Sequence, residues 1–238
     1  MSDAPIRPAS VADADTIAAL HAASWRSAYR GIFKEGTLGP SLDGERRAHW
    51  HGKLGAMIPT DTVLIAGDVG FIAVWAQGDP GFGAYIDNLH VRPERRSGGL
   101  GRRLLGEAMR RVSKRGERGA YLWVFDDNVR AIDFYRRLGG EIVEGGFDEI
   151  DGTQVAHSRI AWRDTARLAD ACACIQRVTG RMTGGLRSGY AESEGRRSFE
   201  RFLAGQQSIG SRGTASVGLA RHPSVMKLAV GKTFSKPL

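Results

Sequence analysis

The feature that most constrains this chain is a predicted strand that runs through a glycine-rich turn into an amphipathic helix. Residues 84–91 alternate between apolar and polar in the manner of a strand, and Pro93 ends the pattern because proline has no N–H to donate. From Gly99 to Lys114 apolar residues recur at helical spacing, with arginines on the opposite face. A strand that leads directly into such a helix is typical of folds that mix the two elements in layers.

The turn between strand and helix has the composition of an anion site. Gly98, Gly99 and Gly101 lack side chains, so a polyanion can approach the backbone closely. The first amides of the helix, at the positive end of its dipole, favour such a ligand, and Arg96 and Arg102 would add charge-assisted hydrogen bonds. The dinucleotide fingerprint and the P-loop are both absent. The residues predict a phosphate or pyrophosphate site, with a plain glycine-rich turn as the alternative.

The remaining hydrophobic patterns predict the elements on either side of this unit. Helices are expected over Ser10–Arg30, Leu42–Leu54 and Val129–Leu138. Strands are expected over Thr62–Ala66, Phe71–Ala76, Tyr121–Phe125, Glu141–Ile150 and Thr153–Trp162. Strand-helix-strand units require a partly parallel sheet, so the predicted fold class is α/β with a mixed sheet.

Charge divides the chain after Arg163. Of the 34 basic and 26 acidic residues, twelve and five fall in Asp164–Leu238, so this segment carries +7 of the total +8. Thr165–Val178 has a helical pattern, after which Gly, Ser and Arg predominate without a period. We therefore predict a folded domain over residues 1–163 and a basic, weakly ordered extension over residues 164–238. Nucleic acid is expected as a partner only through this extension.

Cysteine content and hydropathy bear on the compartment. Cys172 and Cys174 are too few for a disulfide framework, and their C-x-C spacing matches no zinc or C-x-x-C redox motif. The chain has no apolar run of about eighteen residues that would span a membrane. Its first ten residues lack the basic-then-apolar pattern of a secretory signal. A cytoplasmic protein with no metal site and no membrane partner is expected.

Two motifs in register resemble the GNAT N-acetyltransferase family. Val91-Arg92-Pro93 followed by Arg96-Ser97-Gly98-Gly99-Leu100-Gly101 matches the family's V-x-P and [RQ]-x-x-G-x-[GA]. Downstream, Asn128, Ala131, Phe134-Tyr135 and Gly139 resemble its N-x-x-A-x-x-F-Y-x-x-x-G helix. The resemblance covers about Ile6 to Trp162. It departs from the family at Gly98, where many relatives carry a basic residue, so the turn has less charge but more accessible backbone.

The resemblance implies a GNAT fold, in which a mixed central sheet of about six to seven strands is flanked by helices and splayed at the acyl-CoA site. It implies an N-acetyltransferase that moves an acetyl group from its co-substrate acetyl-CoA to a primary amine by direct attack in a ternary complex. The acceptor stays open between a small-molecule amine and a protein N-terminus or lysine. A homodimer is also compatible with it. The alternative class is a module that binds acyl-CoA without chemistry.

The resemblance also implies which residues hold the cofactor. The backbone of Leu89, His90 and Val91 would pair with the pantetheine arm like an added strand, and an amide there would stabilise the oxyanion. The pyrophosphate would lie against Arg96, Ser97, Gly98, Gly99, Leu100, Gly101 and Arg102. Asn128 and Ala131 would contribute from the next helix, where Asn128 caps the helix, holds the cofactor, or does both.

Tyr135 and Asp87 are the candidate catalytic residues. Tyr135 occupies the position of the family's general acid, which protonates the departing thiolate; the alternative is a core tyrosine. Asp87 would act as a base directly or through water, would only orient a cationic amine, or would be a solvated carboxylate. Strand parity predicts that Asp87 shares a face with Leu89 and Val91.

Trp25 and Tyr29 are the candidate acceptor-binding residues. They are four residues apart and therefore share one face of the first helix. The resemblance gives that helix a wall of the acceptor site, and core packing is the alternative.

Overall fold

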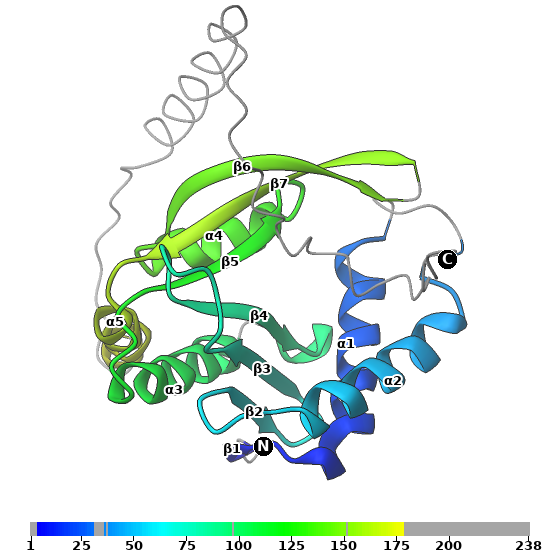
Figure 1. The fold of residues 1–238 in the computed structure, drawn as a ribbon, viewed down its shortest axis with the longest axis horizontal. Helices are drawn as coiled ribbons and strands as arrows, with labels where there is room; N and C mark the ends of the chain where they lie inside the picture. Colours follow the sequence, from blue (N-terminus) through cyan, green and yellow to red (C-terminus); the bar gives the residue numbers. More distant parts are fainter. Residues whose placement is uncertain (1–3, 31–35, 37, 97, 151, 179–238) are drawn as a thin grey trace, which may run out of the picture. The chain divides into compact units, whose positions relative to one another are not determined.

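A mixed seven-stranded sheet in the order β1-β2-β3-β4-β5-β7-β6 organises the fold (Figure 1). The computed structural model describes residues 4–30, 36, 38–96, 98–150 and 152–178. The strands are β1 Ile6–Pro8, β2 Thr62–Ala66, β3 Gly70–Trp75, β4 Ala84–Val91, β5 Ala120–Phe125, β6 Glu141–Ile150 and β7 Thr153–Trp162. The helices are η1 Val11–Asp13, α1 Ala14–Ala28, α2 Ser41–Gly55, η2 Pro93–Arg95, α3 Leu100–Lys114, α4 Val129–Arg137 and α5 Thr165–Val178.

The mixed sheet confirms the predicted fold class. Neighbouring strands are antiparallel, and the described exception is β4 with β5, which run parallel because α3 carries the chain back between them. The short edge strand β1, paired with β2, was not predicted. Its three residues include a proline and are too few to show an alternation.

Helices cover both faces of the sheet. On one face, α3, α4 and α5 pack on the largest apolar cluster, which contains Leu104, Leu138, Ile160 and Leu168. On the other face, α1 and α2 bury Ile17 and Trp50 against β2 and β3. A third cluster, in which Trp25 of α1 meets Phe125 of β5, extends this second layer toward the β6–β7 hairpin. The central strands are thus buried on both sides, as the continuous apolar run at β5 predicted.

Helix α5 follows the predicted domain boundary and packs on α3. Its residues Leu168, Ala169 and Cys172 are buried in the main apolar cluster. A Cβ on Gly106 would lie 2.8 Å from the Cβ of Cys172, so glycine permits this close helix contact. The compact unit therefore includes the chain as far as Val178. The boundary after Arg163 stays a prediction, and the predicted weak order beyond Val178 concerns residues outside the described part.

The described helices also bear on the membrane question. None of those within residues 4–178 combines the length and the hydropathy that crossing a bilayer requires.

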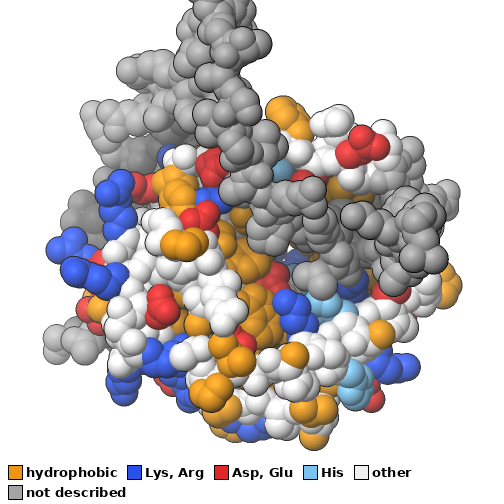
Figure 2. All heavy atoms as spheres, viewed as in Figure 1, with side chains coloured by type: hydrophobic (Ala, Val, Ile, Leu, Met, Phe, Trp, Pro, Cys, Tyr) orange, Lys and Arg blue, Asp and Glu red, His pale blue; other side chains and the backbone are white. Residues whose placement is uncertain are grey.

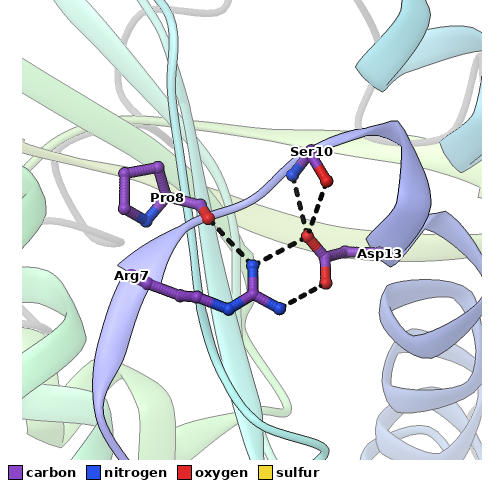
Figure 3. Close-up of polar contacts among 4 residues, drawn as sticks. All are labelled: Arg7, Pro8, Ser10 and Asp13. Carbon is purple, nitrogen blue, oxygen red and sulfur yellow. Dashed lines mark hydrogen bonds and ion pairs between the residues drawn. The ribbon is translucent and has the colours of Figure 1, made fainter.

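A polar cluster fixes the start of α1 against β1 (Figure 3). The Arg7 guanidinium donates to both oxygens of Asp13, at 2.9 and 2.6 Å, and to the carbonyl of Pro8 at 3.0 Å. Asp13 also accepts from the backbone N–H of Ser10 at 2.8 Å. The hydrogen bond from Arg7 contributes most to lowering the pKa of Asp13 to about 2. The predicted helix from Ser10 is in fact the short η1 turn followed by α1, joined at this carboxylate.

Replacing Asp13 with asparagine tests this cluster. The folded-state pKa of Asp13 lies below its ordinary 3.8, so its stabilisation is complete above that pH and is lost as pH falls toward 2. We expect Asp13→Asn to lower the free energy of unfolding by about 1 kcal/mol at pH 7. The variant should also lose part of the acid sensitivity between pH 4 and 2 in urea titrations. Asp68→Asn, which breaks an exposed ion pair with Arg92, is the control. Identical pH profiles for wild type and Asp13→Asn would contradict the assignment.

Candidate active site

The central opening of the sheet lies between β4 and β5. Within the described strands, the two pair only where Ala84 meets Ala120 and Tyr85 meets Tyr121. From Ile86 to Val91, β4 keeps its partner β3 but has no partner on the β5 side. The expected splay is thus present, and one edge of β4 presents backbone hydrogen-bonding groups to the opening. An extended ligand can pair with such an edge as an added strand.

A β-bulge in β4 redirects the residues at this opening. Ala73 pairs with Asn88 and Val74 with Ile86, so Asp87 is the extra residue. Leu89 and Val91 pack against the α3 cluster, whereas Asp87 bonds to Trp75, which packs against the cluster on the α1–α2 face. The prediction that Asp87 shares a face with Leu89 and Val91 was therefore wrong. Strand parity assumes an unbroken register, and the bulge breaks it.

Asp87 is held in a largely apolar setting on the α1–α2 face. Trp75 Nε1 donates to its Oδ2 at 2.7 Å, and Lys53 Nζ lies 4.6 Å from the centre of the Trp75 ring. Burial raises the pKa of the Asp87 carboxyl above its ordinary value, while hydrogen bonds from Trp75 and Tyr85 and the charge of Lys53 act against that rise. A carboxylate whose pKa is raised by burial has the properties of a proton acceptor.

The turn after β4 forms an open cradle at the start of α3. Gly99 precedes the helix in the left-handed conformation, with φ of 77°, which favours glycine. Around Gly98, the one atom near the position of a Cβ is the Arg95 carbonyl oxygen, at 3.6 Å. A large anion can therefore reach the backbone at the positive end of α3. Leu100 and Gly101 lie in the first turn of that helix, while Ser97 lies outside the described residues.

Arg96 joins this cradle to the neighbouring elements. Its Nε donates to the Val91 carbonyl at 3.2 Å and its Nη1 donates to Ser27 Oγ on α1 at the same distance. Burial and the nearby charge of Arg130 lower the pKa of Arg96. The charge of Arg130 thus adds to that of Arg96 near this turn, which favours a bound anion. Arg102, the other predicted contact, has its Nη2 3.5 Å from the position of a Cβ on Gly99 and also borders a cavity between α3 and α5.

Helix α4 brings Asn128 and Tyr135 to the other side of the opening. The Asn128 side-chain oxygen accepts from the backbone N–H of Ala131 at 3.3 Å, so Asn128 caps the helix. Tyr135 is 9% exposed and packs edge-on against Trp162. Burial raises the pKa of the Tyr135 hydroxyl, and the neighbouring Tyr29 raises it further. The phenol therefore keeps its proton at neutral pH and can donate it.

Trp25 and Tyr29 of α1 lie among aromatic side chains of the same layer. Their rings are 5.6 Å apart, and Tyr29 also meets Phe125 of β5 edge-on at 5.4 Å. The Tyr29 hydroxyl is close enough to Tyr85 and Tyr135 to raise the pKa of both. Figure 2 shows apolar side chains in a band through the middle of the view, with charged side chains beside it.

A buried histidine pair supports the α1 side of β4. His21 and His90 stack with their rings 4.8 Å apart, and Trp50 Nε1 donates to His21 Nδ1 at 3.0 Å. Burial lowers the pKa of His90 to about 3 and that of His21 well below its ordinary value. Both rings are therefore neutral. The His90 side chain faces α1 and bonds to Asn88, so the part of His90 that remains for the predicted cofactor contact is its backbone.

Sequence reasoning missed several residues of this site, namely His21, Ser27, Arg46, Lys53, Trp75 and Tyr85. Arg46 of α2 is buried with its guanidinium 4.9 Å from the centre of the Trp25 ring. Arg46 and Lys53 lie seven residues apart on α2, a spacing that places both on one helix face. That spacing was the available signal, but charged residues on a helix are usually solvated.

Comparison with known proteins gives this geometry a context. The model of the acetyltransferase (GNAT) family matches residues 35–140, a span that includes both motifs and the opening between β4 and β5. An uncharacterized N-acetyltransferase of Methanocaldococcus jannaschii is 42% identical over 65 residues, which are 26% of this chain and 29% of that protein. The uncharacterized N-acetyltransferase YuaI of Bacillus subtilis is 25% identical over 166 residues, 68% of this chain and 95% of YuaI.

Solved structures share the fold. The PaiA N-acetyltransferase from Thermoplasma acidophilum, crystallised with coenzyme A, superimposes with a TM-score of 0.52 at 22% identity. The match covers 66% of this chain and 98% of the PaiA chain. This match supports the fold of the sheet and its helices.

Proposed function

This chain belongs to the GNAT acetyltransferase family, and from that premise we propose that it transfers an acetyl group from acetyl-CoA to a primary amine. The observation that carries the proposal is the opening between β4 and β5, which leads to a glycine-rich cradle at the start of α3. The opening suits an extended thioester arm and the cradle suits a pyrophosphate. Acetyl-CoA contains both groups, with the thioester at the end of an extended arm that is attached to the pyrophosphate.

The reaction exchanges one acyl bond for another. The amine lone pair forms a bond to the acetyl carbon, the carbon–sulfur bond breaks, the nitrogen loses one proton and the sulfur gains one. The protein has to hold the two reactants together, stabilise the oxyanion, accept a proton on the amine side and donate one on the thiolate side.

The free edge of β4 is proposed to bind and polarise the thioester. The stretch of β4 from Leu89 to Val91 lies beside a gap where β5 has separated, so a backbone N–H that points into the gap can donate to the carbonyl oxygen of the acetyl group. The neutral, stacked His90 side chain keeps this stretch of β4 packed on α1. Arg96, bound to the Val91 carbonyl, places its positive charge beside the cradle. These residues bind the substrate and need not change protonation.

Tyr135 is proposed to donate the proton to the departing sulfur. Its side chain is buried against Trp162, and burial holds the pKa of its hydroxyl above the ordinary value. A phenol with a raised pKa stays protonated until a strong base forms beside it, and a thiolate released into an enclosed site is such a base. Asn128 orients this helix by capping it, and a direct role of Asn128 and Ala131 toward the cofactor stays a prediction.

Asp87 is proposed to accept the proton of the amine, directly or through a water molecule. It lies on the face of β4 that meets the aromatic side chains of α1, where Trp25 and Tyr29 are the proposed wall of the acceptor site. Its raised pKa makes it a better base than an exposed carboxylate. The alternative role is to orient a cationic amine without taking its proton. The two roles differ in their effects on kcat and KM.

Other predictions concern the surroundings of the protein. The acceptor stays open between small amines and protein amines, because a fold does not determine a substrate. A cytoplasmic location, a homodimer and nucleic-acid binding through the basic extension remain predictions. The extension falls mostly in residues 179–238, outside the described part.

A panel of primary amines, assayed by release of the CoA thiol from acetyl-CoA, tests the proposed activity. At least one amine should increase thiol release by 100-fold or more over buffer, the order that positioned acid–base groups supply. The full chain and a chain ending after Val178 should be compared, since α5 belongs to the folded unit. Tight acetyl-CoA binding with no turnover on any amine would favour the module that binds acyl-CoA without chemistry.

Tyr135→Phe tests the proposed acid. Loss of the hydroxyl should reduce kcat by roughly 100-fold or more because the thiolate must then leave unprotonated. The dissociation constant of CoA, measured by calorimetry, should change less than about twofold, since the ring still packs on Trp162. Unchanged kcat would remove Tyr135 from the mechanism.

Asp87→Asn tests the proposed base. If Asp87 is the base, kcat/KM rises with pH as its carboxyl group loses its proton. Asp87→Asn should abolish this rise and should lower kcat roughly 100-fold. Trp75→Phe removes a hydrogen-bond donor that favours the ionised Asp87 carboxylate, so in this variant the rise of kcat/KM should move to higher pH. Asp133→Asn, at an exposed carboxylate of α4, is the control. A raised KM with normal kcat in Asp87→Asn would instead indicate amine orientation.

A further inference from the structure

A cavity lies outside the proposed active site, between α3 and α5. It has a volume of about 390 Å³ and is bordered by Arg102, Arg103, Glu107 and Arg110 of α3, with Cys172 on the opposite helix. This size falls within the range of about 300–1,000 Å³ that is usual for small-molecule sites. The wall that α5 provides lies beyond the residues matched by the family model, which end at residue 140.

The lining of this cavity carries excess positive charge. Three arginines and one glutamate give a net charge of +2. The single carboxylate is shared, because Glu107 accepts from Arg110 at 2.7 Å and from Arg111 at 3.0 Å, and Arg111 does not border the cavity. In Figure 2 Lys and Arg side chains gather along the left margin of the view, the side on which Figure 1 places α3 and α5. The cavity thus favours an anion.

Two buried groups add to the preference of the cavity for an anion. Arg102 Nε is buried and has no hydrogen-bond partner among the described residues, and a buried guanidinium donor normally has one. The Cys172 thiol cannot supply the missing negative charge, because burial raises its pKa to about 11 despite the nearby Arg102 and Arg110. The cavity therefore has cationic donors on α3 and a neutral, mainly apolar wall on α5.

The position of the cavity separates it from the cradle at the start of α3. Arg103, Glu107 and Arg110 project from successive turns of the helix, on the side that faces α5. Arg102 lies at the border of the two regions, since its Nη2 is 3.5 Å from the position of a Cβ on Gly99. A ligand among the other arginines would lie along α3, beside the cradle and apart from the free edge of β4.

We propose that the α3–α5 cavity binds a phosphate monoester of about nucleoside-monophosphate size, as a ligand separate from acetyl-CoA. A dianionic phosphate matches the net charge of +2 and offers acceptors to several guanidinium groups at once. The apolar wall of α5 accommodates the organic part. The proposal does not depend on the acetyl-transfer reaction, because its ligand contacts none of the proposed catalytic residues.

Calorimetric titration of 5′-AMP into the full chain, in the presence of saturating CoA, tests the proposal. CoA occupies the cradle and the opening, so binding of 5′-AMP under these conditions reports a different site. We expect saturable binding of one 5′-AMP per chain and no binding of adenosine, which lacks the phosphate. Binding should weaken as salt is raised, because exposed guanidinium–phosphate attraction is screened.

Arg110→Gln and Arg111→Gln form a matched pair for this titration. The two variants lose the same charge from adjacent residues that share Glu107, but only Arg110 borders the cavity. Arg110→Gln should raise the dissociation constant of 5′-AMP roughly tenfold through loss of a charge-assisted hydrogen bond, and Arg111→Gln less than twofold. Thermal melting should show both variants folded.

Three outcomes would overturn the proposal. These are no binding of 5′-AMP to the CoA-saturated chain, equal weakening in the two variants, and binding seen only when CoA is left out. Binding only in the absence of CoA would mean that 5′-AMP occupies the acetyl-CoA site and not the α3–α5 cavity. A separate failure of CoA itself to bind would contradict the proposed acetyl transfer, while the same titration without CoA would still measure the effect of the two substitutions on the cavity.

Discussion

The early end of the pairing between β4 and β5 is the constraint on which the rest of the site depends. After Tyr85 and Tyr121 the two strands separate, and the sheet gives up backbone hydrogen bonds that would otherwise be formed in its centre. The separation is maintained because each strand is held by its other neighbour, β4 by β3 and β5 by β7. A strand edge without a partner among the described strands is thereby built into the sheet.

The bulge at Asp87 decides which face of β4 each side chain occupies. Before it, Ile86 points into the α3 cluster; after it, Leu89 and Val91 do so, and the extra residue stays on the opposite face. This irregularity places the carboxylate against Trp75 and close to Lys53, where burial changes its proton affinity. The backbone that follows remains available to the gap. A regular strand would have moved either the carboxylate or the apolar side chains to the wrong face.

Much of the fold was predictable because its elements have strong local signals. The bounds of β2, β4, β6 and β7 agree with those predicted, and each is bordered by glycine, proline or a charged turn. The cradle was also predictable, since Gly98, Gly99 and Arg96 act through backbone access and charge that any strand-to-helix turn would present. The burial of Arg46 and His21 was not predictable. Local sequence places such residues at the surface, and only the packing of α2 on α1 encloses them.

The sequence by itself determined the order of most strands and helices, the glycine-rich turn with its neighbouring arginines after β4, and the two motifs that resemble one family. These depend on periodicity, on glycine and on charge, all of which are local. The tertiary structure alone decided where β4 and β5 separate, which face Asp87 occupies and how α5 closes a cavity against α3. Those features depend on pairing and packing between residues far apart in the chain, and no local pattern contains that information.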